Sequence, residues 1–239
     1  MVKDMALLEG RIAIQLLRLN SIIVLLFLFL GCAEEVPNEE MTDTVIEDEV
    51  LPFFNTADLT PEWVYKTDAG FDEIHTIGDF SFLDQKGEVF DESSVEGKIY
   101  VANFMFTTCG GICPKMTSNM STVQDAIIDK KDVMLLSHSV MPWVDDVDKL
   151  SEYADLKGAD YDKWRFLTGE KEKIYDLART SYFAEKRLGL QKDSSEFLHT
   201  ENFFLIDGKR RIRGVYNGTL PAEINRLVEA IEILQKEES

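Results

Sequence analysis

The run Ile99-Tyr-Val-Ala-Asn-Phe-Met-Phe106 is followed directly by Thr107-Thr-Cys-Gly-Gly-Ile-Cys-Pro114, and together they decide the fold of this chain. The first run is rich in β-branched and aromatic residues, which predicts a buried strand. Threonine and glycine residues around Cys109 end that strand, and a helix is expected to begin after Pro114. Cys109 and Cys113 therefore lie in the loop between a strand and a helix, a position that displays reactive sulfur.

Residue spacing predicts further elements on both sides of this stretch. Upstream, two short strands are expected within 80–90, joined by a turn that contains Gly87. Downstream, the pattern predicts, in order, a helix over 115–130, a strand over 133–140, a helix over 145–156, a strand over 164–167, a helix over 171–180, strands over 202–206 and 211–216 joined at Asp207-Gly208, and a helix from 221 to about 235.

This order of elements predicts an α/β sandwich of the thioredoxin-like type. It would have a central mixed sheet flanked by helices, an N-terminal hairpin, and a closing C-terminal hairpin plus helix. The cysteine loop would then lie at the carboxyl end of a central strand, where open α/β sheets place their sites. A sizeable core is expected, since 45% of the 239 residues are hydrophobic.

The first 32 residues have the pattern of an export signal. Basic residues precede the apolar stretch 21–30, which is too short for a comfortable membrane span. Phe29-Leu-Gly-Cys32 resembles a bacterial lipobox, whose cysteine is lipidated and becomes the mature N-terminus, although its first two residues depart from the usual ones. The alternative is an uncleaved signal anchor with Cys32 in the membrane. In both cases we expect an exported, membrane-tethered domain that faces the periplasm or the cell exterior.

Three segments are predicted: a signal peptide with lipobox over 1–32, an acidic tether and domain-edge segment over 33–69, and the thioredoxin-like domain over 70–239. Residues 33–50 carry eight acidic side chains and no basic one, which favours a solvated spacer. The whole chain has a formal net charge of −19. Such a surface repels phosphate backbones, so we expect no nucleic-acid partner.

The cysteine count favours a chemical role for the pair in the loop. Of the three cysteines, Cys32 belongs to the signal, which leaves Cys109 and Cys113 in the exported domain. Two cysteines in an oxidising compartment can form a structural disulfide. A bridge that closes so small a loop would constrain the unfolded chain very little, so stability is a poor reason for it. The spacing is also one residue longer than in the usual redox C-x-x-C motif, which favours soft-metal binding.

His199 is the candidate third ligand. It precedes the first strand of the closing hairpin, and in the expected topology that turn lies beside the cysteine loop. Two thiolates and one imidazole make a three-coordinate site. Thiolates select Cu(I) and imidazole also suits Cu(II), so the set can hold copper in either oxidation state. A structural zinc would want a fourth protein ligand. The plainer alternative for His199 is an ordinary packing or surface role.

The remaining histidines and methionines near the motif have simpler interpretations. His138 lies within the predicted strand 133–140 and is expected to pack in the core. Met116 and Met120 follow Cys113 at helical spacing, which favours core packing over thioether ligation. Met141 ends the second buried strand and could approach the site. No partner is predicted for His75.

These residues together resemble the Sco (SenC) copper chaperones, which are thioredoxin-like. The resemblance covers about residues 75–217 and rests on 80–87, 97–104, the C-x-x-x-C-P element within 106–115, 164–169, His199 and 204–208. It implies copper bound by Cys109, Cys113 and His199. It also implies delivery to the binuclear copper centre of cytochrome c oxidase, with an oxidase subunit as the copper-accepting partner, or reduction of that centre's cysteines before loading. The chain departs from the family at Met141, where aspartate is frequent, and at Leu198, where an acidic residue is frequent.

A thiol–disulfide reductase acting on cysteines of a partner protein is the main alternative. Cys109 would attack and Cys113 would resolve the mixed disulfide, unless the helix N-terminus lowers the pKa of Cys113 and reverses the roles. Copper binding needs His199, whereas dithiol exchange does not. A peroxidase on the same fold would need a basic residue beside one thiolate, for which Lys115 is the nearby candidate.

Overall fold

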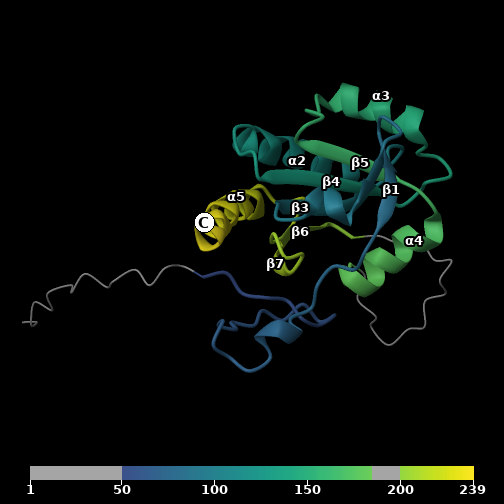
Figure 1. Cartoon of the computed structure of the whole chain (residues 1–239). Helices are drawn as coiled ribbons and strands as arrows, with labels where there is room; N and C mark the ends of the chain where they lie inside the picture. Colours follow the sequence, from purple (N-terminus) through teal and green to yellow (C-terminus); the bar gives the residue numbers. More distant parts are fainter. Residues whose placement is uncertain (1–49, 185–199) are drawn as a thin grey trace, which may run out of the picture. The chain divides into compact units, whose positions relative to one another are not determined.

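The apolar run 99–106 forms β3 (Ile99–Met105), a central strand of a seven-stranded sheet (Figure 1). The structure is a computed structural model, and it describes residues 50–184 and 200–239. All seven residues of β3 are buried, because the strand has neighbours on both edges and packing on both faces. The parallel neighbour is β4 (Val133–Ser139) and the antiparallel neighbour is β6 (Asn202–Ile206).

The sheet is mixed, as the order of elements predicted. The strand order is β2-β1-β5-β4-β3-β6-β7. Strands β3, β4 and β5 are parallel to one another, while both hairpins pair antiparallel at the two edges. The strands not yet bounded are β1 (Ser81–Asp84), β2 (Val89–Asp91), β5 (Trp164–Thr168) and β7 (Ile212–Asn217).

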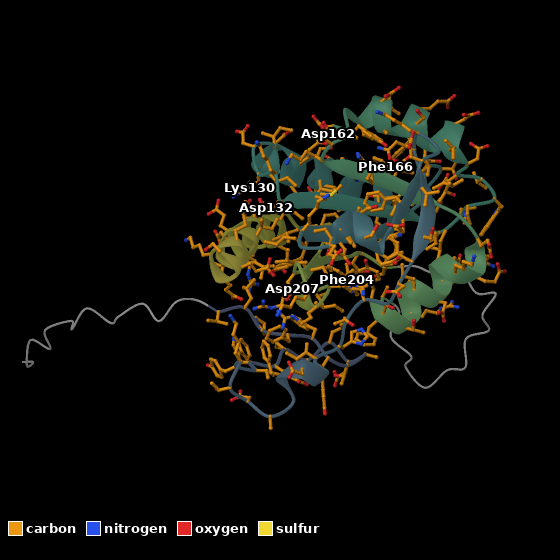
Figure 2. All side chains as sticks on the ribbon, viewed as in Figure 1. Lys130, Asp132, Asp162, Phe166, Phe204 and Asp207 are labelled. Atoms are coloured by element: carbon orange, nitrogen blue, oxygen red, sulfur yellow. The ribbon has the colours of Figure 1, made fainter. Side chains whose placement is uncertain are left out.

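Helices cover both faces of the sheet and enclose two cores (Figure 1). One core, which contains Phe166, lies between the sheet and α2, α3 and α5. The other contains Phe204 and lies between the opposite face and α4 with η3 (Figure 2). The helices and short turns are α2 (Cys113–Ile127), α3 (Val147–Lys157), α4 (Lys171–Asp176), α5 (Pro221–Glu238), η1 (Phe71–Glu73), η2 (Glu92–Val95) and η3 (Leu177–Ser181). The thioredoxin-like α/β arrangement is therefore confirmed.

Some predicted boundaries were wrong. Helix α2 begins at Cys113, two residues before the predicted start, because Pro114 occupies its first turn, where a missing N–H costs nothing. The predicted helix over 171–180 is two pieces, since α4 passes into the π-helical turn η3. In the closing hairpin the left-handed backbone position is taken by Arg210 (φ 62°) and not by Gly208, because the turn extends beyond the Asp-Gly pair.

The first described residues pack onto the edge of the domain. Arg213 is 3% exposed, and its guanidinium donates to the carbonyls of Leu51 at 2.7 Å and Pro52 at 3.1 Å. It also pairs with Glu237 at 2.6 Å, and Glu237 accepts the Leu51 N–H at 2.7 Å. Trp63, in contrast, is 57% exposed.

Several sequence predictions fall outside the described residues. These are the signal peptide over 1–32 with Cys32, the tether over 33–49, and His199. Within 50–184 and 200–239, no helix is long and apolar enough to cross a membrane.

Candidate functional site

The cysteine loop lies at the carboxyl end of β3, between that strand and α2, as predicted. Cys109 is partly exposed, whereas Cys113 is 5% exposed and packs with the core under α2. Both cysteines are free thiols, with no disulfide between them. The structure thus brings the two predicted sulfur ligands together, one at the surface and one beneath it.

The sulfur of Cys109 takes the place of a helix cap. The first turn of a helix leaves N–H groups without partners inside the helix, and α2 has no side-chain cap at Ile112. The Cys109 sulfur accepts hydrogen bonds from the backbone N–H groups of Gly111, Ile112 and Cys113, and from the thiol of Cys113. It therefore faces the positive end of the α2 dipole, which stabilises a thiolate.

The two thiols consequently differ in acidity. Partial burial acts to raise the pKa of Cys109, but the hydrogen bonds from the Cys113 thiol and the backbone outweigh it, and its pKa falls below the ordinary 9.0. Burial, together with the neighbouring Cys109, raises the pKa of Cys113 to about 12. The geometry therefore favours Cys109, and not Cys113, as the thiol that the helix N-terminus activates.

Alkylation should therefore separate the two thiols. We expect iodoacetamide to modify Cys109 first, with a pH midpoint below 9.0, because the thiolate is the nucleophile. Cys113 should stay unmodified until the pH nears 12 or the chain unfolds. Timed alkylation followed by peptide mass spectrometry measures both rates. A Cys113→Ala control, which lacks the S–H donor, should move the Cys109 profile to higher pH. Equal reactivity of the two thiols in the wild type would contradict this assignment.

A buried carboxylate that the sequence analysis did not single out ties the cysteine loop to the sheet. Asp145 accepts hydrogen bonds from the Thr107 N–H at 3.1 Å, the Thr107 hydroxyl at 2.5 Å and the Ser139 hydroxyl at 2.6 Å. The predicted helix over 145–156 included both Asp145 and Asp146, but α3 begins at Val147. Only Asp146 caps α3, by accepting the Lys149 N–H at 2.8 Å.

His199, the predicted third ligand, lies outside the described residues. Within the described parts of the chain, no group of three or more His, Cys, Asp or Glu side chains could hold a metal ion. The residues after His199 are tied to α2: Asn119 donates to the Gly218 carbonyl at 2.7 Å, and the Gly218 N–H donates to the Glu201 carbonyl at 2.7 Å. Helix α2, which begins at Cys113, is thus linked to the start of β6.

The other histidines and methionines have structural roles. His138 is fully buried among aromatic rings, as predicted. His75, for which no partner was predicted, donates from Nε2 to the Ser181 carbonyl at 2.7 Å. Met116 and Met120 are fully buried in the core beside Cys113, which confirms packing for both.

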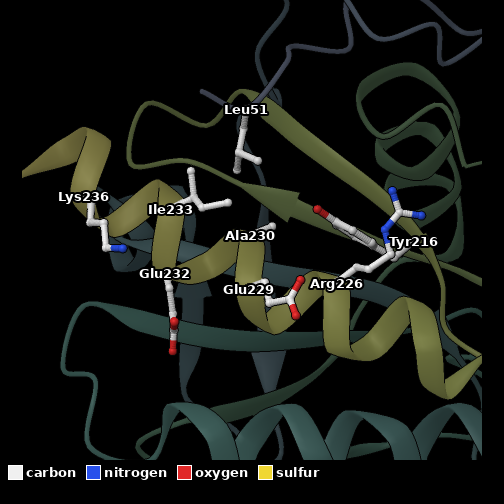
Figure 3. A pocket seen from close by; sticks show the side chains of 8 residues that line it. All are labelled: Leu51, Tyr216, Arg226, Glu229, Ala230, Glu232, Ile233 and Lys236. Carbon is white, nitrogen blue, oxygen red and sulfur yellow. The ribbon is translucent and has the colours of Figure 1, made fainter. Parts of the chain in front are cut away.

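A surface groove lies elsewhere on the domain, between α5, β7 and the N-terminal segment (Figure 3). Its volume is about 320 Å³, and its walls combine Leu51, Tyr216 and Ala230 with the charged side chains of Arg226 and Glu229. None of the described residues of the cysteine loop lines this groove. The groove is therefore separate from the two thiols.

Comparison with known proteins gives one consistent result. The SCO1/SenC family model matches residues 69–234. A SCO1 protein homologue from Bacillus subtilis strain 168 is 30% identical over 146 residues, which cover 60% of this chain and 75% of that protein.

Solved structures agree with this match. A SCO1/SenC family lipoprotein from Bacillus anthracis is 28% identical with a TM-score of 0.60, over 67% of this chain and 95% of that chain. Arabidopsis thaliana ScoI, solved with copper bound, is 25% identical with a TM-score of 0.51, over 65% of this chain and 97% of that chain.

Proposed function

Because this chain belongs to the SCO1/SenC family, we propose that it is a copper chaperone that binds one copper ion through Cys109, Cys113 and His199. The observation that carries the proposal is the pair of unbridged thiols at the end of β3, one of them at the surface. Thiolates are soft ligands that select Cu(I), and an imidazole added to them also suits Cu(II). ScoI of Arabidopsis thaliana, a structural relative, has been solved with copper bound.

The strand register supports His199 as the third ligand. In the antiparallel ladder of β3 and β6, Ala102 pairs with Phe204. If the same register continued past this last pair, Thr200 would lie level with Phe106, the residue that opens the cysteine loop. His199 is the residue immediately before Thr200 in the chain. Its imidazole would complete a three-coordinate site, and a partner's ligand could bind the copper at the position that the protein leaves unfilled.

Copper transfer would proceed by ligand exchange. Partner thiolates or other ligands would replace the three protein ligands one at a time, with Cys109 leaving first, because it is the more exposed sulfur. The Sco resemblance indicates the acceptor: a cytochrome c oxidase subunit that carries the binuclear copper centre.

A lipid anchor at Cys32 would hold the domain at the membrane, on the periplasmic side or at the cell exterior. The export pattern of residues 1–32 supports this location. The Bacillus anthracis relative is described as a lipoprotein. A tether of residues 33–49 would let the domain reach a membrane-bound acceptor.

Thiol–disulfide reduction is the second candidate function, and the unequal acidity of the thiols favours it. An attacking thiol needs thiolate character and access, and Cys109 has both. Cys113 lies within hydrogen-bond reach of the Cys109 sulfur and could resolve the mixed disulfide. This function requires no histidine.

Copper titration distinguishes the two functions. The reduced full-length chain should bind one copper ion, and a His199→Ala variant should bind it more than about 100-fold more weakly, since even indirect supports of a ligand contribute 10–100-fold. His75→Ala is the matched control, because His75 bonds to a carbonyl away from the cysteine loop, and it should bind copper as the wild type does. Absence of tight copper binding by the wild type, together with reduction of a disulfide substrate, would overturn the chaperone function and leave the reductase.

A further inference from the structure

Asp145 is the one carboxylate of the described residues that bonds directly to the cysteine loop, and its side chain has no contact with solvent. The residue is 0% exposed. A buried carboxylate is tolerated only where hydrogen bonds replace its water, and Asp145 accepts three of them, two from Thr107 and one from Ser139. Bonds to a charged acceptor are among the stronger ones in proteins. The carboxylate of Asp145 thus holds one end of this loop, although burying its charge costs free energy.

The main chain of Asp145 is itself held rigidly. Its N–H donates to the Met141 carbonyl at 2.9 Å, and its carbonyl accepts the Thr168 hydroxyl at 2.7 Å. Ser139 and Thr168 are the last residues of β4 and β5. Asp145 therefore connects the ends of three parallel strands, because Thr107 follows β3 by two residues.

The rest of the loop has weaker support. The Cys109 N–H donates to the Phe106 carbonyl at 3.4 Å, which is long for such a bond. At Gly110 a Cβ atom would meet no other atom within 4 Å. The Thr107 end of the loop is thus fixed by Asp145, while the glycine end projects from the domain. Cys109 is thus held from two sides: its sulfur by the N–H groups at the N-terminus of α2, and its backbone through the Thr107 end that Asp145 fixes.

We propose that Asp145 is a positioning residue that holds Cys109 in place beside Cys113 and so determines how tightly the loop retains copper. This inference rests on the proposed copper site. It assigns no direct contact between Asp145 and the ion, since the carboxylate acts through Thr107.

Three variants of the full-length chain test the positioning role. Asp145→Asn removes the charge and weakens the bonds to Thr107. Thr107→Val removes one of those bonds and leaves the charge in place. Asp207→Asn is the matched control, because Asp207 is also 0% exposed and accepts bonds from Lys209 and Arg211, but at the opposite end of β3, in the β6–β7 turn.

Copper retention is measured first, by competition with a Cu(I) chelator. We expect Asp145→Asn to bind copper about 10–100-fold more weakly, as for other groups that orient a ligand, and Thr107→Val to lie between it and the wild type. Asp207→Asn should match the wild type. If Asp145→Asn binds copper as tightly as Asp207→Asn, the positioning role is wrong. Should Asp145→Asn fail to fold, Thr107→Val decides, and wild-type affinity in that variant overturns the proposal.

A second readout does not involve copper. In dithiothreitol buffers, the two thiols lose two electrons and two protons to form the Cys109–Cys113 disulfide, while oxidised dithiothreitol is reduced to its dithiol. Loosening the loop lowers the chance that the sulfurs meet, so Asp145→Asn should reduce the equilibrium constant for this step about 10-fold, by analogy with ligand positioning. A wild type that binds no copper would refute the proposed function alone. An unchanged disulfide equilibrium in Asp145→Asn would refute the positioning role alone.

Discussion

A Cys113→Ser variant is expected to hold a stable mixed disulfide with glutathione through Cys109, whereas the wild-type chain should release the glutathione. Cys109 lies at the α2 N-terminus with its pKa lowered, so it attacks disulfides as a thiolate. In the wild type the neighbouring Cys113 then displaces glutathione and closes the protein disulfide. Serine keeps a hydroxyl donor near Cys109 but cannot displace a sulfur. Incubation with oxidised glutathione followed by intact-mass spectrometry measures the trapped adduct.

Cys109→Ser is the matched control for this experiment, and all the chains compared carry Cys32→Ser, which removes the third thiol. Burial is the largest cause of the raised pKa of Cys113 and persists without Cys109, so Cys113 should carry little thiolate at pH 7 and little adduct should form. Both serine variants should also bind copper more than about 100-fold more weakly than the wild type, since each lacks a proposed ligand. A stable adduct on Cys109→Ser but not on Cys113→Ser would reverse the roles of the two cysteines.

Replacement of His138 by phenylalanine is expected to remove a large part of the acid sensitivity of the fold. His138 is 0% exposed and lies among the rings of Phe82, Phe104 and Tyr182. Within the described residues neither ring nitrogen has a hydrogen-bond partner. Burial therefore lowers the pKa of His138 from 6.5 to about 3.

The direction of the pH effect follows from that shift. Below pH 6.5, His138 binds a proton in the unfolded chain, whereas in the folded chain it binds that proton only near pH 3. The stabilising contribution of the neutral side chain is therefore fully present above pH 6.5 and is lost as the pH falls, at about 1.4 kcal/mol per pH unit. Between pH 6.5 and pH 4 the loss amounts to about 3 kcal/mol.

Urea denaturation at several pH values tests this prediction. The His138→Phe variant should show a smaller decrease in the free energy of unfolding on acidification, by about the amounts above, and should be about 1 kcal/mol more stable near pH 7, because two unpartnered polar atoms are gone. Phe166→Leu is the control: it truncates a fully buried ring in the other core, away from the aromatic cluster around His138, so it should lower stability equally at every pH. Parallel curves for the wild type and His138→Phe would show that His138 does not cause the acid sensitivity.

Local sequence patterns predicted most of the elements and the place of the thiols. Strand β3 and its loop were predictable because a continuous apolar run that is ended by Thr, Gly and Pro fits few structures other than a buried strand followed by a loop. The boundaries of α2, η3 and the β6–β7 turn were less accurate, since helix ends and turn lengths depend on competing local hydrogen bonds. His199 remains a prediction, and its ligand role rests on the family resemblance and the register of β6.

By itself, the sequence determined the order of strands and helices, the presentation of Cys109 and Cys113 at a strand end, and the family. Periodicity and chain breakers are properties of neighbouring residues, so they can be read along the chain. Only the tertiary structure decided that Cys109 rather than Cys113 faces the helix N-terminus, that Asp145 bonds to Thr107 from 38 residues away, and that His138 is buried without a partner. Burial and hydrogen-bond partners arise when distant segments pack, and no local pattern encodes them.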